Sequence, residues 1–180
     1  IPCLEGAGGI SVLKGLFISV QKLGYQIVVY SMLEGSMREI FEGMGITVTI
    51  QADMLSDNFQ EQLDDAEAIF VNTLQMIPVI QKLEKKYVNI HWWIHEPPAY
   101  FMLYRDQISN DFFQKLNENV HVYAAGNLVH DYIWNQFHYN AEVLNFGIRK
   151  LENKGKKSII GGGLKKNFLL PSYYFDYLKG

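Results

Sequence analysis

A histidine and a glutamate stand side by side at the end of an apolar stretch, Val88–Ile94. His95 and Glu96 follow this stretch directly, and Pro97 and Pro98 come next, where we expect regular structure to stop. This pattern predicts a buried strand with two ionisable side chains at its tip. In an open parallel α/β sheet, ligands bind beyond the carboxyl ends of the strands. The pair therefore indicates a functional site, provided that the rest of the chain forms such a sheet.

The same residues are a poor match for a metal site. The helical zinc motif needs His-Glu-x-x-His, and the two prolines oppose a helix here. On a strand, His91 and His95 share one face with Trp93, whereas Glu96 lies on the other face. The chain also has no Asp-x-Asp triplet to hold a divalent metal ion. We therefore expect no metal, with His95 as the catalytic residue and His91 as a structural one.

The segments around this tip alternate between helix and strand patterns. Apolar positions three and four residues apart predict helices at 10–23, 36–44, 59–63, 73–84, 109–117 and 127–137. Short β-branched or apolar runs predict strands at 26–30, 46–50, 68–72, 88–95, 120–124 and 141–144. Asn127 is expected to cap the last helix. Such alternation predicts an α/β fold, a doubly wound, mostly parallel sheet with helices on both faces.

The charge of the chain changes after residue 148. Residues 1–148 have a net charge of −9, which disfavours nucleic acid as a partner, whereas 149–180 have +6. We expect an N-terminal domain over 1–148, a flexible basic linker over 149–166, and over 167–180 either the start of a second domain or a segment that packs back on the first. The basic tail could contact phosphates or an anionic membrane surface.

The start and the cysteine content bear on location. The chain begins without Met or a basic leader region, so we expect no signal peptide and a fragment of a longer product. Cys3 is the single cysteine, which rules out an internal disulfide, and no apolar run is long enough to span a bilayer. A reducing cytoplasm is the expected location.

A glycine-rich turn, residues 6–9, precedes the first predicted helix. The dinucleotide fingerprint requires Gly or Ala where Ser11 stands and an acid where Ser31 stands, so a nicotinamide cofactor is not expected. The chain also contains no Gly-Lys-Ser/Thr of a P-loop. What remains is that the backbone of Gly8 and Gly9 could approach an anion at a helix N-terminus.

Several segments, in this order and spacing, resemble one family. The glycine turn, the strand with Leu23 and Gly24 before it, the strand that ends in His95-Glu96, and the run Val143–Ile148 are similar to the N-terminal half of family-4 glycosyltransferases of the GT-B fold. Phe168–Gly180 looks like the opening strand of their second domain. The chain departs from the pattern at Tyr25, where His is common, and it lacks the Glu-x7-Glu motif of the second domain.

The resemblance implies a hexosyltransferase that moves a sugar from a nucleotide-sugar donor to a glycan or glycolipid acceptor in cell-surface polysaccharide or glycolipid synthesis. The reaction would retain anomeric configuration and need neither metal nor cofactor. His95 would be the catalytic residue against the donor sugar. Gly8, Gly9, Glu96, Tyr100 and Asn127 would contact donor or acceptor, and the aromatic residues after Pro98 would form an acceptor wall.

The resemblance also implies partners. These are the donor, the acceptor and a C-terminal domain of the same protein, without which the 180 residues should be inactive. A peripheral position on the cytoplasmic face of a membrane is an alternative to a purely cytoplasmic one.

Two further readings stay open. A flavodoxin-like binding module fits the same α/β pattern, although the related receiver type needs acids at strand tips where Asp53 and Asp57 do not lie. A sugar-nucleotide epimerase of the GT-B fold would share the architecture and act on the donor alone.

Overall fold

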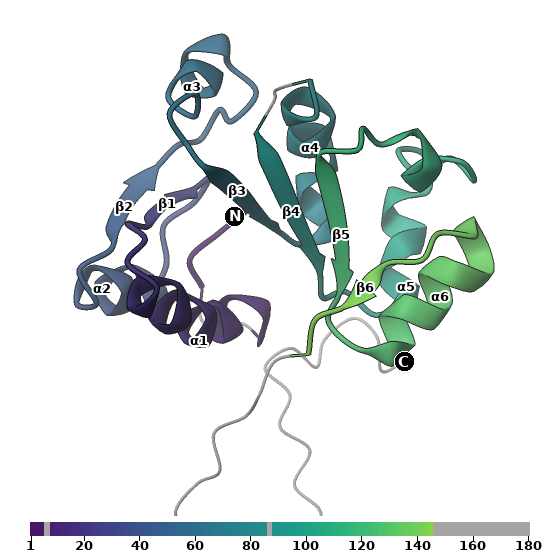
Figure 1. The fold of residues 1–180 in the computed structure, drawn as a ribbon, viewed down its shortest axis with the longest axis horizontal. Helices are drawn as coiled ribbons and strands as arrows, with labels where there is room; N and C mark the ends of the chain where they lie inside the picture. The colour runs from purple at the N-terminus through teal and green to yellow at the C-terminus, as the bar shows by residue number, and fades with distance from the viewer. Residues whose placement is uncertain (6–7, 86–87, 146–180) are drawn as a thin grey trace, which may run out of the picture. The chain divides into compact units, whose positions relative to one another are not determined.

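The computed structural model describes residues 1–5, 8–85 and 88–145, and the structural statements below concern these residues (Figure 1). They belong to one unit, Ile1–Phe146. The predicted domain boundary at residue 148, the linker over 149–166 and the segment over 167–180 lie outside the described residues.

Helices and strands alternate along this part of the chain. The strands are β1 (Val28–Ser31), β2 (Thr47–Ile50), β3 (Ala68–Asn72), β4 (Asn89–Ile94), β5 (Val120–Ala124) and β6 (Glu142–Val143). The α-helices are α1 (Gly8–Lys22), α2 (Met37–Glu42), α3 (Asp57–Glu61), α4 (Ile77–Leu83), α5 (Pro98–Phe101) and α6 (Asn127–Phe137). Single turns of 3₁₀-helix are η1 (Leu74–Met76), η2 (Met102–Tyr104) and η3 (Phe113–Lys115).

The strands form two parallel sheets. One contains β1 and β2, and the other has the order β3-β4-β5-β6, with parallel pairing throughout. The sequence pattern predicts a single sheet, and the structure differs because β1 and β3 are not paired. The edge of β1 opposite β2 pairs instead with the first residues of the chain. Ile1 donates to the carbonyl of Tyr30 at 2.9 Å and accepts from the N–H of Met32 at 3.1 Å.

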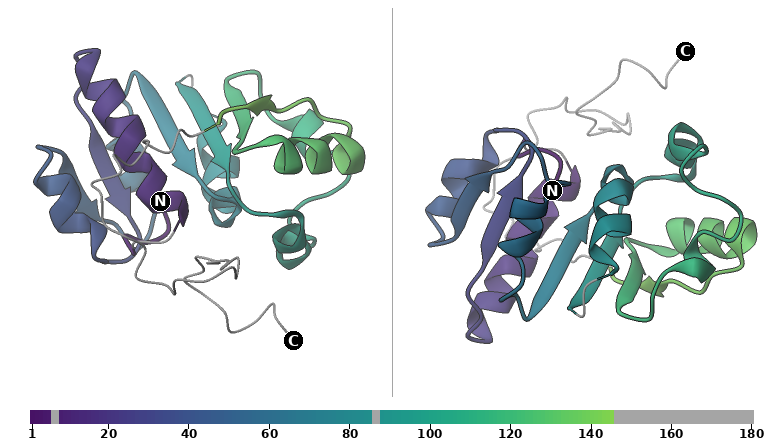
Figure 2. Two further views of the ribbon diagram at one scale, coloured as in Figure 1. Left: turned by 90° about the horizontal axis from the view of Figure 1, so that it is seen from below. Right: turned by 90° about the horizontal axis from the view of Figure 1, so that it is seen from above.

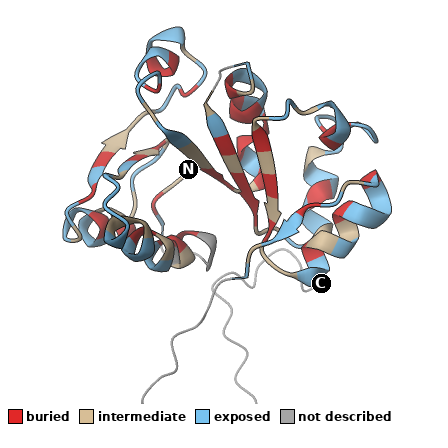
Figure 3. Ribbon diagram, viewed as in Figure 1, coloured by how far each residue is buried: buried red, intermediate tan, exposed pale blue. Residues whose placement is uncertain are grey.

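Two hydrophobic cores cover opposite faces of the strands (Figures 2 and 3). One core joins α1 and α2 to β1 and β2 and includes Phe17, Phe41 and Trp93. The other joins α3, α4, α5 and α6 to the larger sheet and includes Trp92. Because Trp92 and Trp93 are consecutive on β4, they point to opposite faces. This is the Rossmann-like, doubly wound α/β architecture with helices on both faces that the alternation predicts.

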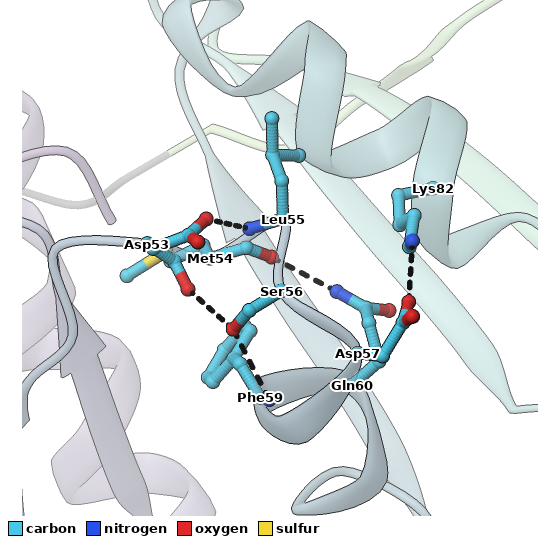
Figure 4. A network of polar contacts seen from close by, with 8 residues as sticks. All are labelled: Asp53, Met54, Leu55, Ser56, Asp57, Phe59, Gln60 and Lys82. Carbon is cyan, nitrogen blue, oxygen red and sulfur yellow. Dashed lines mark hydrogen bonds and ion pairs between the residues drawn. The ribbon is translucent and has the colours of Figure 1, made fainter.

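The loop between β2 and α3 is fixed by its own polar groups and by an ion pair to α4 (Figure 4). The carboxylate of Asp53 accepts the N–H of Leu55 at 3.0 Å, and Ser56 caps α3 by accepting the N–H of Phe59 at 3.4 Å. Asp57 pairs with Lys82 at 2.7 Å between Oδ1 and Nζ. Asp53 therefore stabilises the loop, and Asp57 links the start of α3 to α4.

Three local predictions are wrong. Residues 109–117 contain η3 and no longer helix, and Phe112 and Phe113 in this segment are both buried against Trp92. Regular structure does not stop at the prolines, because Pro98 occupies the first turn of α5, where a missing N–H costs nothing. Asn127 is the first residue of α6 and not its cap, which is Gly126.

Two glycines lie just beyond the ends of α1 and α2, whose last residues are Lys22 and Glu42. Gly24 and Gly45 have φ values of 92° and 77°, in the left-handed region that glycine adopts without a steric penalty. Among the described residues, none of the helices is long and apolar enough to cross a membrane.

Candidate functional site

The carboxyl ends of the strands bring several polar residues to one region. The arrowheads of β3, β4 and β5 point to the same edge (Figure 1). There β3 ends in Asn72, and β4 is followed by His95 and Glu96. The N–H of Ala125, just after β5, donates to the carbonyl of Ile94 at 2.9 Å, so the tips of β4 and β5 are tied together. The structure thus places the predicted pair at the edge where open α/β sheets bind ligands.

His95 carries a neutral imidazole at this edge. Its ring lies against the indole of Trp93, with ring centroids 4.2 Å apart and an interplanar angle of 53°. Burial lowers the pKa of His95 from its ordinary value of 6.5 to about 4. The ring is therefore neutral at pH 7, so one nitrogen can donate a hydrogen bond and the other can accept one.

Glu96 is turned toward the backbone. Its Oε2 accepts the N–H of His95 at 3.1 Å. Burial raises the pKa of Glu96, while hydrogen bonds from the N–H groups of Leu74, Glu96 and His95 and from the side chain of Thr73 act in the opposite direction. His95 and Glu96 are neighbours in the sequence, but the imidazole packs on Trp93, whereas the carboxyl group accepts backbone N–H groups.

Asn72 and Thr73 are candidate site residues that the sequence analysis did not select. Asn72 is fully buried, and neither its Oδ1 nor its Nδ2 has a hydrogen-bond partner in the described structure. Thr73 has a φ of 82°, and its buried Oγ1 lies on the side of the Glu96 carboxyl group. The available signal was the polar residue Asn72 at the end of an apolar strand, the same pattern that selected His95.

Gly8 and Gly9 open α1, as predicted for a glycine turn at a helix start. Residues 6 and 7 of that turn lie outside the described residues. The segment before the turn is anchored at Leu4, whose carbonyl accepts the N–H of Met37 at 2.8 Å. A Cβ on Gly35 would lie 2.2 Å from the carbonyl carbon of Leu4, so only glycine allows this close approach.

Tyr100 and Asn127 are both exposed on short stretches that follow the strand tips. Tyr100 lies in α5, and 38% of it is exposed to solvent.

 Asn127 is the first residue of α6. Phe101, in contrast, is buried and packs on Tyr132 with ring centroids 4.8 Å apart, so it belongs to the core and not to an acceptor wall. Of the aromatic residues after Pro98, Tyr100 is exposed and Tyr104 is half-buried.

His91 lies further from the tip, within a row of side chains on the same face of the sheet. Its Nδ1 is 3.2 Å from the hydroxyl of Tyr123, and its ring stacks on that of His121 with centroids 5.2 Å apart. Burial, and next the charge of His121, lower the pKa of His91. These contacts give His91 a packing role in the middle of β4, separate from the residues at the tip.

Two shallow pockets lie at the opposite ends of the strands. One, of about 570 Å³, is lined by Val88 and Asn89 at the start of β4, and the other, of about 450 Å³, is lined by Val120 and His121 at the start of β5. Neither includes His95 among its lining residues. In the part of the chain that the structure describes, no group of three or more His, Cys, Asp or Glu side chains could hold a metal ion.

Comparisons with protein-family models, with curated proteins and with solved structures give no match to this chain.

Proposed function

We propose that this chain is the N-terminal half of a glycosyltransferase that moves a sugar from a nucleotide-sugar donor to a glycan or glycolipid acceptor. The reaction retains anomeric configuration and uses neither a metal ion nor a cofactor. A second domain of the same protein supplies the other wall of the cleft. The resemblance of the sequence to family-4 glycosyltransferases gives the reaction class, and the α/β fold is compatible with it.

The observation that carries the proposal is the neutral imidazole of His95 at the carboxyl end of β4. Its pKa of about 4 keeps it uncharged at pH 7. A neutral imidazole can hydrogen-bond to a sugar hydroxyl, and Trp93 holds the ring from one side. His95 thereby orients the donor sugar.

The departing nucleoside diphosphate needs hydrogen-bond donors, because negative charge develops on it in the transition state. α1 begins at Gly8 and has 15 residues, and the first N–H groups of a helix have no partner within the helix. Gly8 and Gly9 can therefore approach the diphosphate closely, since they have no side chains. Tyr100 and Asn127 are exposed and able to contact the acceptor.

Ligand binding by the chain tests the first half of the proposal. Saturation-transfer NMR with UDP-glucose, UDP-N-acetylglucosamine and GDP-mannose should detect weak binding of at least one of them. His95→Ala should abolish the signal of the sugar protons. His121→Ala is the matched control, because it removes a histidine from the same face at the amino end of β5. Equal signals for wild type and His95→Ala would remove His95 from the site.

Turnover tests the second half. The chain joined to its second domain should transfer the sugar with retained anomeric configuration, and EDTA should leave the rate unchanged. An inverted product, or loss of the rate in EDTA, would contradict the proposed mechanism.

A further inference from the structure

Thr73 has an unusual backbone conformation at the tip of β3. It is one of two non-glycine residues with positive φ in the described part of the chain, and its φ is 82°. A β-branched side chain at such a φ is a steric outlier. Strained residues of this kind persist only when their surroundings over-determine them, and they concentrate at functional sites.

The contacts that hold Thr73 come from β4. Its N–H donates to the carbonyl of Trp93 at 3.0 Å, and its carbonyl accepts the indole N–H of Trp92 at 2.9 Å. The next N–H along the chain, that of Leu74, donates to the carboxyl group of Glu96. The strained residue therefore joins the tip of β3 to the tip of β4.

Glu96 connects both tips through its carboxyl group. It accepts N–H groups from Leu74, after β3, and from His95, after β4, the latter at 3.1 Å. Tyr104 of η2 lies close enough for the charge of Glu96 to raise the pKa of its hydroxyl, after the larger effect of burial. A general acid or base must face the reacting atoms, whereas this carboxyl group faces the backbone.

We propose that Glu96 is a positioning residue, which clamps the tips of β3 and β4 together and thereby fixes the backbone that carries the His95 imidazole. The effect of this clamp on sugar transfer rests on the proposed function, whereas the clamp itself does not. The proposal also gives a reason for the strained φ of Thr73. This φ lets the next residue, Leu74, direct its N–H to the carboxyl group of Glu96.

Amide NMR tests the clamp without any ligand. When Glu96 ionises, the amide protons bonded to it should shift downfield. We expect the amide proton of Leu74 to titrate with a midpoint above that of an ordinary glutamate, in the direction of the raised pKa. His95→Gln should leave the titration of the Leu74 amide unchanged, which would show that the imidazole does not cause it. Glu96→Gln should abolish it, and Glu118→Gln, on the surface, should not. A Leu74 shift that persists in Glu96→Gln would overturn the clamp.

A double substitution tests the link to Thr73. Glu96→Ala should lower the Tm, and the drop should be at least halved in a Thr73→Gly background, because glycine adopts positive φ without a clamp. Equal drops in the two backgrounds would show that Glu96 does not support the strained residue. If Glu96→Ala fails to fold, the Glu96→Gln titration still decides the proposal.

Affinity tests the role at the site. For the nucleotide sugar that binds wild type, Glu96→Gln should stay within about threefold in Kd, since its amide oxygen still accepts a hydrogen bond, whereas Glu96→Ala should weaken binding about tenfold or more. Suppose that both variants lose the same affinity while the Leu74 amide of wild type still titrates. The negative charge of Glu96 would then contact the ligand directly, which would overturn the positioning role. If no nucleotide sugar binds wild type, the proposed function fails and the amide titration still tests the clamp.

Discussion

The imidazole of His95 lies against the indole of Trp93, with ring centroids 4.2 Å apart, at the carboxyl end of β4. The two side chains share one face because they are two residues apart on the same extended segment. Trp93 is almost fully buried, so it provides a rigid surface against which His95 is held. Burial of the imidazole, of which this contact is one part, lowers its pKa.

The stability of the chain should fall as the pH drops from 6.5 toward 4, in part through His95. The folded state keeps this imidazole neutral down to about pH 4, whereas an unfolded chain binds a proton near pH 6.5. Protons therefore favour the unfolded chain within this window. Urea unfolding across the window should give a flatter pH dependence for His95→Gln than for wild type. His91 acts in the same direction, and His130, whose pKa is raised, acts in the opposite one. An unchanged slope in His95→Gln would contradict the lowered pKa.

Asn72→Leu should stabilise the fold. The amide of Asn72 is fully buried without a hydrogen-bond partner in the described structure, and an unsatisfied buried polar group costs about 1–3 kcal/mol. Leucine has a similar size, so we expect a gain of about 1 kcal/mol in the free energy of unfolding, measured by urea denaturation. Asn110→Leu, at an exposed position, is the control and should change little. A loss of stability in Asn72→Leu would indicate that a bound water or ligand pairs with the amide.

Trp92→Phe should destabilise the fold by about 2 kcal/mol. The substitution removes the indole N–H that donates to the carbonyl of Thr73 at 2.9 Å and leaves a space in the core. Trp134→Phe is the matched control, because this side chain is 49% exposed and should tolerate the change within about 0.5 kcal/mol. Equal effects of the two substitutions would be inconsistent with the hydrogen bond to Thr73.

Gly35→Ala and Gly15→Ala should have opposite effects on stability. A Cβ at residue 35 would lie 2.2 Å from the carbonyl carbon of Leu4, so the backbone must move, at a cost of about 1–3 kcal/mol. A Cβ at residue 15, inside α1, meets nothing within 4 Å, and alanine should stabilise the helix by about 1 kcal/mol. Thermal unfolding of both variants measures the difference. A stable Gly35→Ala would contradict the close approach to Leu4.

The sequence alone was sufficient for features with local causes. Apolar periodicity gave the alternation of strands and helices, and the strands Ala68–Asn72 and Val120–Ala124 have the predicted bounds. The same period of two put His95 on the face of Trp93 and Glu96 on the other, because side chains alternate along any extended segment. The position of His95 at a strand tip followed from the apolar run before it.

Only the tertiary structure decided features that depend on neighbours distant in the chain. The strained φ of Thr73, the partners of Glu96 and the unpaired amide of Asn72 arise where the tips of β3 and β4 meet, and these tips are more than twenty residues apart. The loss of the helix at 109–117 has the same origin, since Phe112 and Phe113 pack around Trp92. Burial and long-range hydrogen bonds overrode local preference at these positions, and no pattern within one segment encodes them.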